Sequence, residues 1–274
     1  MRHRPRHLKK TSGLYRPRHR ASGGNTRAPR TDKPPRRTVQ QALYESLLRK
    51  NITNMCVSAL IVLLGASSFV YGLSLEPSVT IFRFLTVDGT LFTSTGALVC
   101  MVVNLVEIMR RRDIRSKFTY FVRLAMAVAE SVIFIVVVFS QLPVFSQHLP
   151  MFDRYDSFVM HVLIPIFGVG SFLFNDSPQG KLTFSQRWQG TWFVTFYAVV
   201  ILSLISSEKL PSELIPYFFL DYRNEGWGIF AFAFVFVYGV AYLMAWGLSE
   251  WNRSFNRRQI HDLVRSLRGG KEGP

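Results

Sequence analysis

The sequence is poor in cysteine and in the motifs that mark common enzyme classes. Its 274 residues include two cysteines, Cys56 and Cys100, with no CxxC pair and no histidine spacing suited to zinc. Neither a disulfide framework nor a structural metal is therefore expected. There is no Gly-rich phosphate loop, no GxSxG elbow and no HExxH pair. No stretch is long enough to form a separate soluble enzyme domain, and the sequence predicts neither a metal nor a cofactor.

Acidic residues are also scarce, since 17 Asp+Glu stand against 33 Lys+Arg and give a formal net charge of +16. At the same time 49% of the residues are hydrophobic. A soluble domain seldom combines such apolarity with such basicity unless the two are segregated along the chain. Here the segment from Arg2 to Lys50 holds 15 of the 33 basic residues, and most of the remainder alternates long apolar stretches with short polar breaks. This pattern predicts a multi-pass membrane protein.

The apolar stretches are long enough to be read as spanning helices, because a helix needs about 20 apolar residues to cross roughly 30 Å of hydrocarbon. We predict an all-α bundle of six transmembrane helices over residues 51–250. A disordered basic tail, residues 1–50, precedes it, and a basic C-terminal tail, residues 251–274, follows. The six predicted spans are Asn54–Leu75, Phe84–Met109, Phe118–Leu142, Phe158–Phe174, Trp188–Ser206 and Gly228–Leu248.

The basic residues also predict an orientation, because cytoplasmic loops carry an excess of Lys and Arg. Both tails are basic, the break after the second span reads RRRDIRSK, and the break after the fourth holds Lys181 and Arg187. The opposite side has far fewer basic residues: Arg83, Arg154, Lys209 and Arg223. We therefore expect a cell-membrane protein with both termini in the cytoplasm.

The basic N-terminal tail is rich in Pro, Gly, Ser and Arg and has too few apolar residues to form a core. Its charge is suited to anionic lipid head groups, at about 1 kcal/mol per basic residue near the surface. Nucleic acid is the alternative partner, since the same charges would release counterions. No stacking platform or folded binding module accompanies them, so the membrane is the expected partner.

Polar residues inside the predicted spans are candidates for function, because they are costly in lipid. Glu130 lies midway along the third span, where its carboxyl group must be protonated, paired or turned toward a wet cavity. Arg123 is seven residues earlier on the same helical face, although it could also extend to the cytoplasmic interface. Asn104 and Glu107 lie nearer the cytoplasmic end of the second span, where interfacial water explains them. A structural hydrogen bond to another helix explains Glu130 equally well.

A stripe of small and polar residues follows one face of the second span from its outer end. Such a stripe would let another helix or a ligand approach closely, although membrane threonines often only bond a carbonyl one turn back. Its members are Thr86, Thr90, Thr93 and Ala97, with Gly89 and Gly96 beside them.

His161 is the one histidine within the predicted spans, and it lies in the first turn of the fourth. Pro165 follows four residues later, so the carbonyl of His161 lacks its helical donor, and a kink or a polar partner is expected there. A neutral imidazole can take a proton from a hydroxyl group. The predicted topology places Thr86 and His161 in the same leaflet, although a structural role would suit either residue.

Three motifs resemble the androgen-induced-protein family, which includes many bacterial six-span relatives. They are FRFLT at the start of the second span, HVLIP in the fourth and IPYFFLDYRNEGW before the sixth, and the resemblance covers roughly Phe82 to Trp227. It implies a hydrolase that works inside the membrane, as characterised animal members cleave fatty acid esters of hydroxy fatty acids. By that resemblance Thr86 would be the nucleophile and His161 its general base, with an acyl-threonine intermediate released by water.

Two further residues are candidates for an accessory role. Asp221 could orient His161 or line the entrance for a lipid that carries a carboxylate, and Tyr217 could donate a hydrogen bond to a developing oxyanion. The alternative for both is an interfacial segment anchored by its aromatic residues. If these residues act together, a pocket open to the outside or to the lipid is expected between the second, third and fourth spans.

The leading hypothesis is thus hydrolysis of a lipid ester at the outer leaflet, with membrane lipids as partners and substrate. A carrier of small solutes or protons, or a scaffold without catalytic activity, is the alternative. Glu130 favours the carrier, because buried carboxylates often relay protons. The lack of an internal repeat and of paired interrupted helices argues against it.

Overall fold

The computed structural model describes residues 36–75, 78–110, 114, 116–141, 154–176 and 180–269, and no strand occurs within these ranges. The elements in chain order are α1 (Arg36–Leu75), η1 (Val79–Arg83), α2 (Leu85–Arg110), α3 (Lys117–Gln141), α5 (Tyr155–Phe158), η2 (Val159–Leu163), α6 (Ile164–Asn175), α7 (Phe184–Trp188), η3 (Gln189–Thr191), α8 (Trp192–Ser206), η4 (Ser212–Leu214), η5 (Phe218–Leu220) and α9 (Trp227–Gly269).

Six helical segments within the described residues are long and apolar enough to span a membrane. Four of them lie in α1, α2, α3 and α9, while α5, η2 and α6 together form the fourth span, and α7, η3 and α8 form the fifth. The predicted all-α bundle of six helices is confirmed. These six helices fit an integral, multi-pass membrane protein.

The first and last helices extend well beyond the predicted membrane domain. Because α1 begins at Arg36, residues 36–50 are helical, although they were assigned to the disordered basic tail. Likewise α9 continues to Gly269 through most of the segment predicted as a C-terminal tail. The rest of the basic N-terminal tail, residues 1–35, and residues 270–274 lie outside the described part of the chain.

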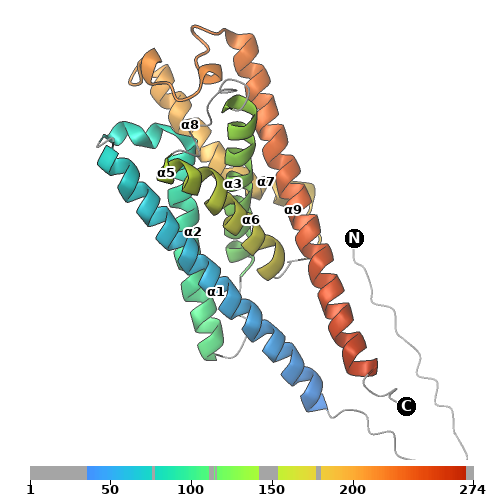
Figure 1. The fold of residues 1–274 in the computed structure, drawn as a ribbon. Coiled ribbons are helices and arrows are strands. Elements are labelled where there is room, and N and C mark those ends of the chain that lie inside the picture. Colours follow the sequence, from blue (N-terminus) through green and yellow to red (C-terminus); the bar gives the residue numbers. More distant parts are fainter. Residues whose placement is uncertain are drawn as a thin grey trace, which may run out of the picture.

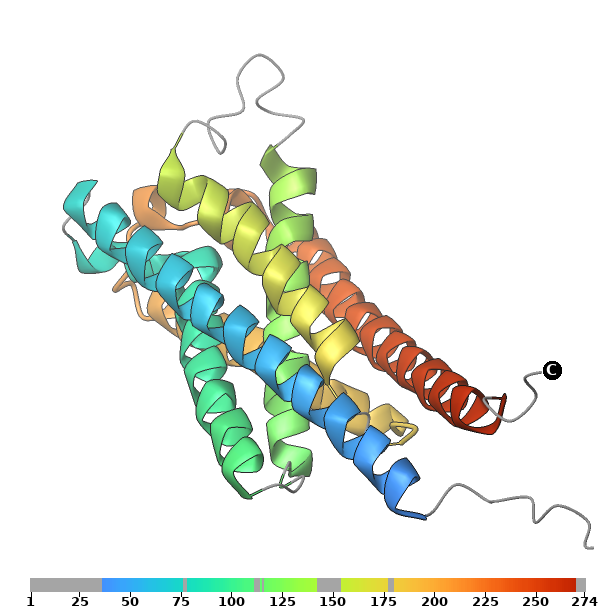
Figure 2. The same cartoon turned by 60° about the horizontal axis from the view of Figure 1, so that its bottom comes forward.

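The bundle is arranged around α3. Figures 1 and 2 show α3 in the middle, with α1 and α2 on one side and α9 on the other. Its central residues from Leu124 to Ala129 are all buried, and Val132 is fully so. A helix that is apolar all round belongs in such a position, since it has no face that prefers water. The surrounding helices turn apolar side chains outward, as expected where lipid is the solvent.

The two ends of the bundle differ in what they carry. The helix α1 begins and α9 ends at the same end, which we call the tail end (Figure 1). The η1 turn, α5 and the connection between α8 and α9 lie at the opposite end, which we call the site end (Figure 1). This arrangement follows from an even number of spans.

Small residues let α2 approach its neighbours closely, as its stripe predicts. A Cβ atom on Gly96 would lie 2.4 Å from the sulfur of Met126 in α3, and one on Gly89 would lie 2.4 Å from Cδ1 of Ile133. Both separations are far below van der Waals contact. Glycine at these two positions therefore holds the first residues of α2 directly against α3, and so sets the position of Thr86.

Arg123 forms a buried ion pair in the tail-end half of the bundle. Its Nε lies 2.5 Å from Oδ2 of Asp176, and only 6% and 3% of the two side chains are exposed. Its Nη2 donates to Oγ of Ser171 at 2.6 Å, and that hydroxyl donates to Oδ1 of Asn54 at 2.8 Å. The sequence left two alternatives for Arg123, an extended side chain at the interface or a pair with Glu130. The structure shows neither, because the guanidinium of Arg123 pairs with Asp176, the residue that follows α6.

Glu107 is likewise held by the protein and not by interfacial water. It is 2% exposed, and its carboxylate accepts from Nδ2 of Asn51 at 3.0 Å and from the backbone N–H of Ile114 at 3.1 Å. Asn104 is equally buried. Their predicted solvation at the interface is therefore wrong, because α1 packs against α2 and Asn51 binds the carboxylate of Glu107.

Candidate active site

Thr86 lies in the first turn of α2 at the site end of the bundle. The turn η1 leads into this helix, and the N–H groups of Val87 and Asp88 both donate to the carbonyl of Phe84, at 3.1 and 3.2 Å. The first N–H groups of a helix have no partner within it, and the N–H of Thr86 has no carbonyl acceptor among the described residues. The side chain of Thr86 is 7% exposed, so its hydroxyl lies in a largely water-free position.

His161 lies within η2, a π-helical turn in the first half of the fourth span. The backbone N–H of Ile164 donates to the carbonyl of Val159, five residues earlier. The discontinuity expected at Pro165 takes this form, because proline cannot donate the next hydrogen bond of an α-helix. Such π-turns are rare and frequently occur at functional sites.

The structure brings Thr86 and His161 together, with Oγ1 of Thr86 3.2 Å from Nε2 of His161. The other ring nitrogen, Nδ1, lies 2.8 Å from the carbonyl oxygen of Ser157. A carbonyl oxygen can only accept, so Nδ1 carries the proton and Nε2 is the free base. The Thr86 hydroxyl must then donate to Nε2, which is the arrangement that a threonine nucleophile and its general base require.

Tyr217 is the third side chain at this point. It precedes η5 in the connection between α8 and α9, and its hydroxyl lies near the Thr86 side chain and the Leu85 backbone. Burial raises the pKa of Tyr217 to about 12, against the opposing effect of the polar groups of Thr86 and Leu85. The phenol is therefore neutral at physiological pH and remains a hydrogen-bond donor beside the hydroxyl of Thr86.

The carboxylate of Asp221 is hydrogen-bonded within the connection between α8 and α9. Its Oδ1 accepts from the backbone N–H of Asn224 at 3.3 Å, and its Oδ2 accepts from Nδ2 of Asn224 at 2.6 Å. Its own carbonyl accepts from the N–H of Glu225 at 2.9 Å. No hydrogen bond joins Asp221 to His161 within the part of the chain that the structure describes. The carboxylate closes the turn before α9, which makes it a structural residue of the connection.

The residues that surround the histidine lie in α5, just before η2. Ser157 precedes His161 by four residues, the spacing that places two side chains on one helical face, and its hydroxyl also lies 3.1 Å from Nδ1. The charge of Asp156 acts on the ring, and Arg154 holds that carboxylate with two hydrogen bonds at 3.1 and 2.7 Å. This group was not predicted from the sequence, although Ser157 and His161 stand at the spacing of one helical turn.

Glu130 lies deeper in the bundle and apart from this pair. It is completely buried, and a Cβ atom on Gly168 of α6 would lie 3.5 Å from its Cγ. Thr93 of α2 is its nearest polar neighbour, yet neither carboxylate oxygen makes a well-formed hydrogen bond. Thr93 is seven residues, or roughly 10 Å, along the helix from Thr86. Glu130 is therefore too distant to take part in proton transfer between Thr86 and His161.

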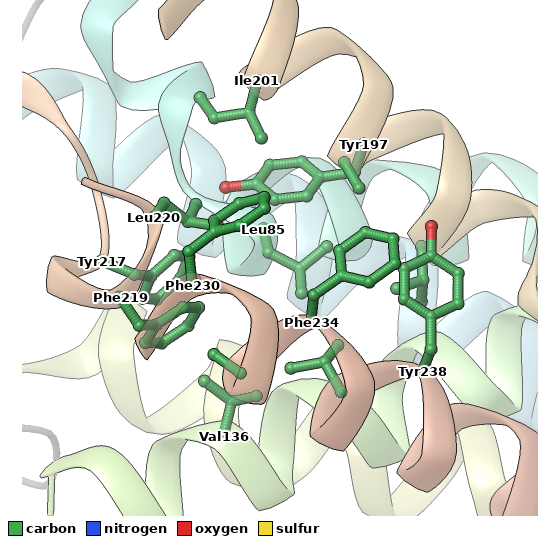
Figure 3. Close-up of a pocket in the computed structure, with 14 residues that line it drawn as sticks. Leu85, Val136, Tyr197, Ile201, Tyr217, Phe219, Leu220, Phe230, Phe234 and Tyr238 are labelled. Atoms are coloured by element: carbon green, nitrogen blue, oxygen red, sulfur yellow. The ribbon is translucent and has the colours of Figure 1, made fainter. Parts of the chain in front are cut away.

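An apolar cavity of about 60 Å³ lies at the site end of the bundle, and Figure 3 shows the residues that line it. Leu85 and Tyr217, which flank Thr86, line one end of it, and the remaining residues come from α3, α8, η5 and α9. The pocket was expected between the second, third and fourth spans. The fourth span does not line this cavity, because α8 and α9 diverge at the site end and leave the space between them.

No group of three or more His, Cys, Asp or Glu side chains that could hold a metal ion occurs among the described residues. No disulfide joins the two cysteines, and the thiol of Cys100 lies against Arg123. Comparisons with protein-family models, with characterised proteins and with solved structures found no match.

Proposed function

We propose that this protein is an intramembrane hydrolase of lipid esters, with Thr86 as the nucleophile and His161 as the general base. The observation that carries the proposal is the 3.2 Å contact between Oγ1 of Thr86 and Nε2 of a histidine whose Nδ1 is committed to a backbone carbonyl. The resemblance of the FRFLT and HVLIP motifs to the androgen-induced-protein family supports the same two residues in the same roles.

The first half of the reaction transfers the acyl group to the protein. Oγ1 of Thr86 attacks the ester carbonyl carbon while its proton passes to Nε2 of His161. The tetrahedral intermediate carries a negative oxygen, for which the Tyr217 hydroxyl and the N–H of Thr86 are the available donors. Collapse of the intermediate breaks the bond to the alcohol oxygen, which takes the proton from Nε2. The alcohol leaves and acyl-Thr86 remains.

The second half restores the enzyme with one water molecule. Nε2 of His161 removes a proton from the water as its oxygen attacks the acyl carbon, and the second tetrahedral intermediate expels Oγ1 of Thr86. Thr86 regains its proton from Nε2, and the fatty acid departs. Throughout both halves the proton stays on Nδ1 of His161 and is donated to the Ser157 carbonyl, which keeps the ring oriented without a carboxylate.

The position of the pair favours a lipid as substrate. Thr86 lies in the first turn of a spanning helix and His161 lies one and a half turns into another, so both sit near the boundary between head groups and hydrocarbon. Ester groups of membrane lipids occupy that depth. The distribution of basic residues predicts that this end of the bundle lies in the outer leaflet.

The test is hydrolysis by purified protein in detergent or nanodiscs, with 4-nitrophenyl acyl esters and fatty acid esters of hydroxy fatty acids as substrates. We expect Thr86→Ala and His161→Ala to lower kcat/KM by about a hundredfold or more, the usual contribution of a nucleophile or base. Thr86→Ser, which keeps a hydroxyl, should retain measurable activity.

A matched control is Thr95→Ala, because Thr95 lies on the exposed face of the same helix. It should hydrolyse esters like the wild type. Equal loss in Thr95→Ala and Thr86→Ala would point to damage to α2 as a whole and count against the nucleophile. Thermal unfolding of all variants shows whether each is folded.

A carrier that couples to protons is the second candidate, and Glu130 is the observation that favours it. A carboxyl group with no exposed surface and no well-formed hydrogen bond is unusual within a spanning helix. Proton-coupled transport in proteoliposomes, lost in Glu130→Gln and accompanied by no ester hydrolysis in the wild type, would favour this function over the first.

A further inference from the structure

Three threonines follow one face of α2, and the proposed reaction uses only the first of them, Thr86. Thr90 and Thr93 lie four and seven residues further on, the spacing that keeps side chains on one face of a helix. Both are completely buried, and neither hydroxyl group makes a well-formed hydrogen bond with any residue that the structure describes. Buried hydroxyl groups nearly always have a partner, because an unmade hydrogen bond is costly.

Other hydroxyl groups in the spanning helices do have partners. Serine and threonine within a helix commonly donate to a carbonyl group about one turn earlier. Ser131 of α3 donates in this way to the carbonyl of Ala127 at 2.8 Å, and Thr195 of α8 donates to that of Thr191 at 3.1 Å. The two inner threonines of α2 are exceptions to this pattern, which points to a partner outside the protein.

The carboxyl group of Glu130 lies beside these hydroxyl groups. It is completely buried and also makes no well-formed hydrogen bond within the described residues, and Thr93 is the polar side chain that acts on it. A Cβ atom on Gly168 would lie 3.5 Å from Cγ of Glu130 and 3.7 Å from Cγ2 of Thr93, which are ordinary van der Waals distances. Glycine at this position therefore leaves a methyl-sized space next to both side chains. We call Thr90, Thr93 and Glu130 the polar cluster.

Water is the ligand that suits the polar cluster. Its hydroxyl groups can both donate and accept hydrogen bonds, and its carboxyl group offers two oxygen atoms. A buried water molecule typically makes about three hydrogen bonds to polar groups that otherwise lack partners. Water at this place would therefore satisfy the groups that the protein itself leaves unpaired.

The second half of the proposed reaction needs a water molecule where bulk water hardly reaches. Thr86 is 7% exposed, and its neighbours Leu85 and Val87 are apolar and buried. An ester that arrives from the lipid brings no water with it. Thr90 is one turn away, a rise of roughly 6 Å, and one water molecule with two hydrogen bonds of roughly 2.8 Å each spans that separation. A water molecule bound at Thr90 is thus within reach of an acyl group on Thr86.

We propose that the polar cluster holds ordered water and supplies the molecule that hydrolyses acyl-Thr86. The inference rests on the proposed function, to which it adds Thr90 and Thr93 as positioning residues for deacylation. The oxygen of the water at Thr90 attacks the acyl carbon while Nε2 of His161 takes one of its protons. The bond from the acyl carbon to Oγ1 of Thr86 then breaks, and Nε2 returns the proton to Oγ1. Water held at Thr93 and Glu130 replaces the molecule that was consumed.

The test separates the two halves of the reaction by stopped-flow kinetics with a 4-nitrophenyl ester. The first equivalent of 4-nitrophenolate reports acylation, and the later steady rate reports deacylation. Thr90→Val combined with Thr93→Val removes both hydroxyl groups and keeps their shape. We expect this double variant to acylate at the wild-type rate and to deacylate about tenfold to a hundredfold more slowly, the cost of a misplaced reactant. Acyl-Thr86 should then accumulate and be detected by mass spectrometry.

Thr195→Val is the matched control, because it makes the same change at a hydroxyl group that is bonded within its own helix. It should match the wild type in both phases. Glu130→Leu should slow deacylation as the double variant does, whereas Glu130→Gln, which keeps two hydrogen-bonding atoms, should not. An equal decrease in both phases of the double variant, or an unchanged steady rate, would overturn the proposal. A steady rate that requires sodium in place of choline would put a cation in the polar cluster and overturn it as well.

A second arm does not depend on catalysis. Pulsed X-rays split bound water into hydroxyl radicals, which oxidise the side chains beside it. Met126 is the reporter, because it lies one turn before Glu130 on α3 and its sulfur lies against Gly96 of α2. Met126 should be oxidised in Thr86→Ala protein, and adding the two valines should remove that oxidation. Oxidation of Met109, which is 72% exposed, should be the same in both proteins.

The two arms separate failure of this inference from failure of the proposed function. Hydrolysis that depends on Thr86, with a steady rate unchanged in the double variant and no oxidation of Met126, would overturn the water site and leave the hydrolase intact. Oxidation of Met126 that depends on the polar cluster, with no hydrolysis of any ester, would overturn the hydrolase and support only the water site.

Discussion

His161 donates its Nδ1 proton to the carbonyl oxygen of Ser157, 2.8 Å away, within one turn of the same helix. The orienting group is thus part of the backbone, where catalytic histidines often use a carboxylate. The Ser157 hydroxyl at 3.1 Å is a second and weaker contact. The carbonyl of Ser157 is therefore needed to orient the ring of His161, whereas the Ser157 side chain is not.

The first prediction concerns Ser157→Ala. Because the carbonyl still accepts the Nδ1 proton, kcat for ester hydrolysis should fall by less than about tenfold, the effect of one modest hydrogen bond. His161→Ala should reduce it by about a hundredfold or more. The measurement is kcat for both variants with a long-chain ester, and equal losses would show that the hydroxyl and not the carbonyl orients the ring.

Tyr217→Phe removes the proposed donor to the oxyanion and keeps the ring that lines the cavity. Loss of one such donor lowers kcat by about 10²–10³, and KM should stay near the wild-type value because the apolar wall is unchanged. Phe219→Leu is a suitable control, since Phe219 lines the same cavity without a hydroxyl. A rise in KM at constant kcat would assign Tyr217 to binding alone.

The pKa of Tyr217 gives a separate prediction. Burial raises it to about 12, so the folded state favours the neutral phenol. Its contribution to stability should therefore be complete below pH 10, the ordinary pKa of tyrosine, and be lost as the pH rises toward 12. Tyrosinate absorbance in the near ultraviolet should show an ionisation near pH 12 that Tyr217→Phe removes. Removal of an ionisation near pH 10 instead would mean that the hydroxyl is not buried.

The ion pair of Arg123 and Asp176 is predicted to be a principal stabilising contact of the tail-end half. Arg123→Met or Asp176→Asn alone leaves one buried charge without its partner and should lower the free energy of unfolding by about 3–5 kcal/mol. The double change to Met and Leu should recover much of that loss. Arg187→Met breaks a more exposed pair with Glu250, at 3.4 Å, and should cost about 1 kcal/mol or less.

Unfolding of these variants in mixed detergent micelles provides the comparison. If the double variant were as unstable as the sum of the single ones, the contribution of the two side chains would lie in their separate contacts, such as that of Arg123 to Ser171, and not in their pairing.

Glu130→Gln tests whether the most buried carboxyl group takes part in the reaction. The amide has nearly the same shape and costs less to bury than a charged group, so the variant should be at least as stable as the wild type. Its ester hydrolysis should remain close to the wild-type rate because Thr86 lies about two helical turns away. Loss of hydrolysis with an unchanged melting temperature would place Glu130 in the chemistry.

The spans could be predicted from the sequence because hydrocarbon thickness sets their length. For Thr86 and His161 the prediction needed two steps, since an alternating topology puts both residues at one end of the bundle and the motif resemblance then selects them. The partner of Arg123 could not be predicted in this way. Its partner Asp176 follows the last apolar residue of its span, where composition alone reads it as part of a loop.

The cavity and the roles of Tyr217 and Asp221 could not be obtained from periodicity. Residues 207–226 fold back over the site end as two short 3₁₀ turns, η4 and η5, and no repeat of apolar residues specifies that path. The same path places Tyr217 at Thr86 and leaves Asp221 to close a turn with Asn224. The divergence of α8 from α9 likewise depends on this connection.

Labelling with a serine- and threonine-directed fluorophosphonate probe tests the central claim most directly. Purified wild-type protein should be labelled on Oγ1 of Thr86, as located by mass spectrometry. Labelling should be lost in Thr86→Ala, be strongly slowed in His161→Ala, and be unaffected in Thr95→Ala. Labelling that persists at wild-type level in folded Thr86→Ala protein would contradict the account.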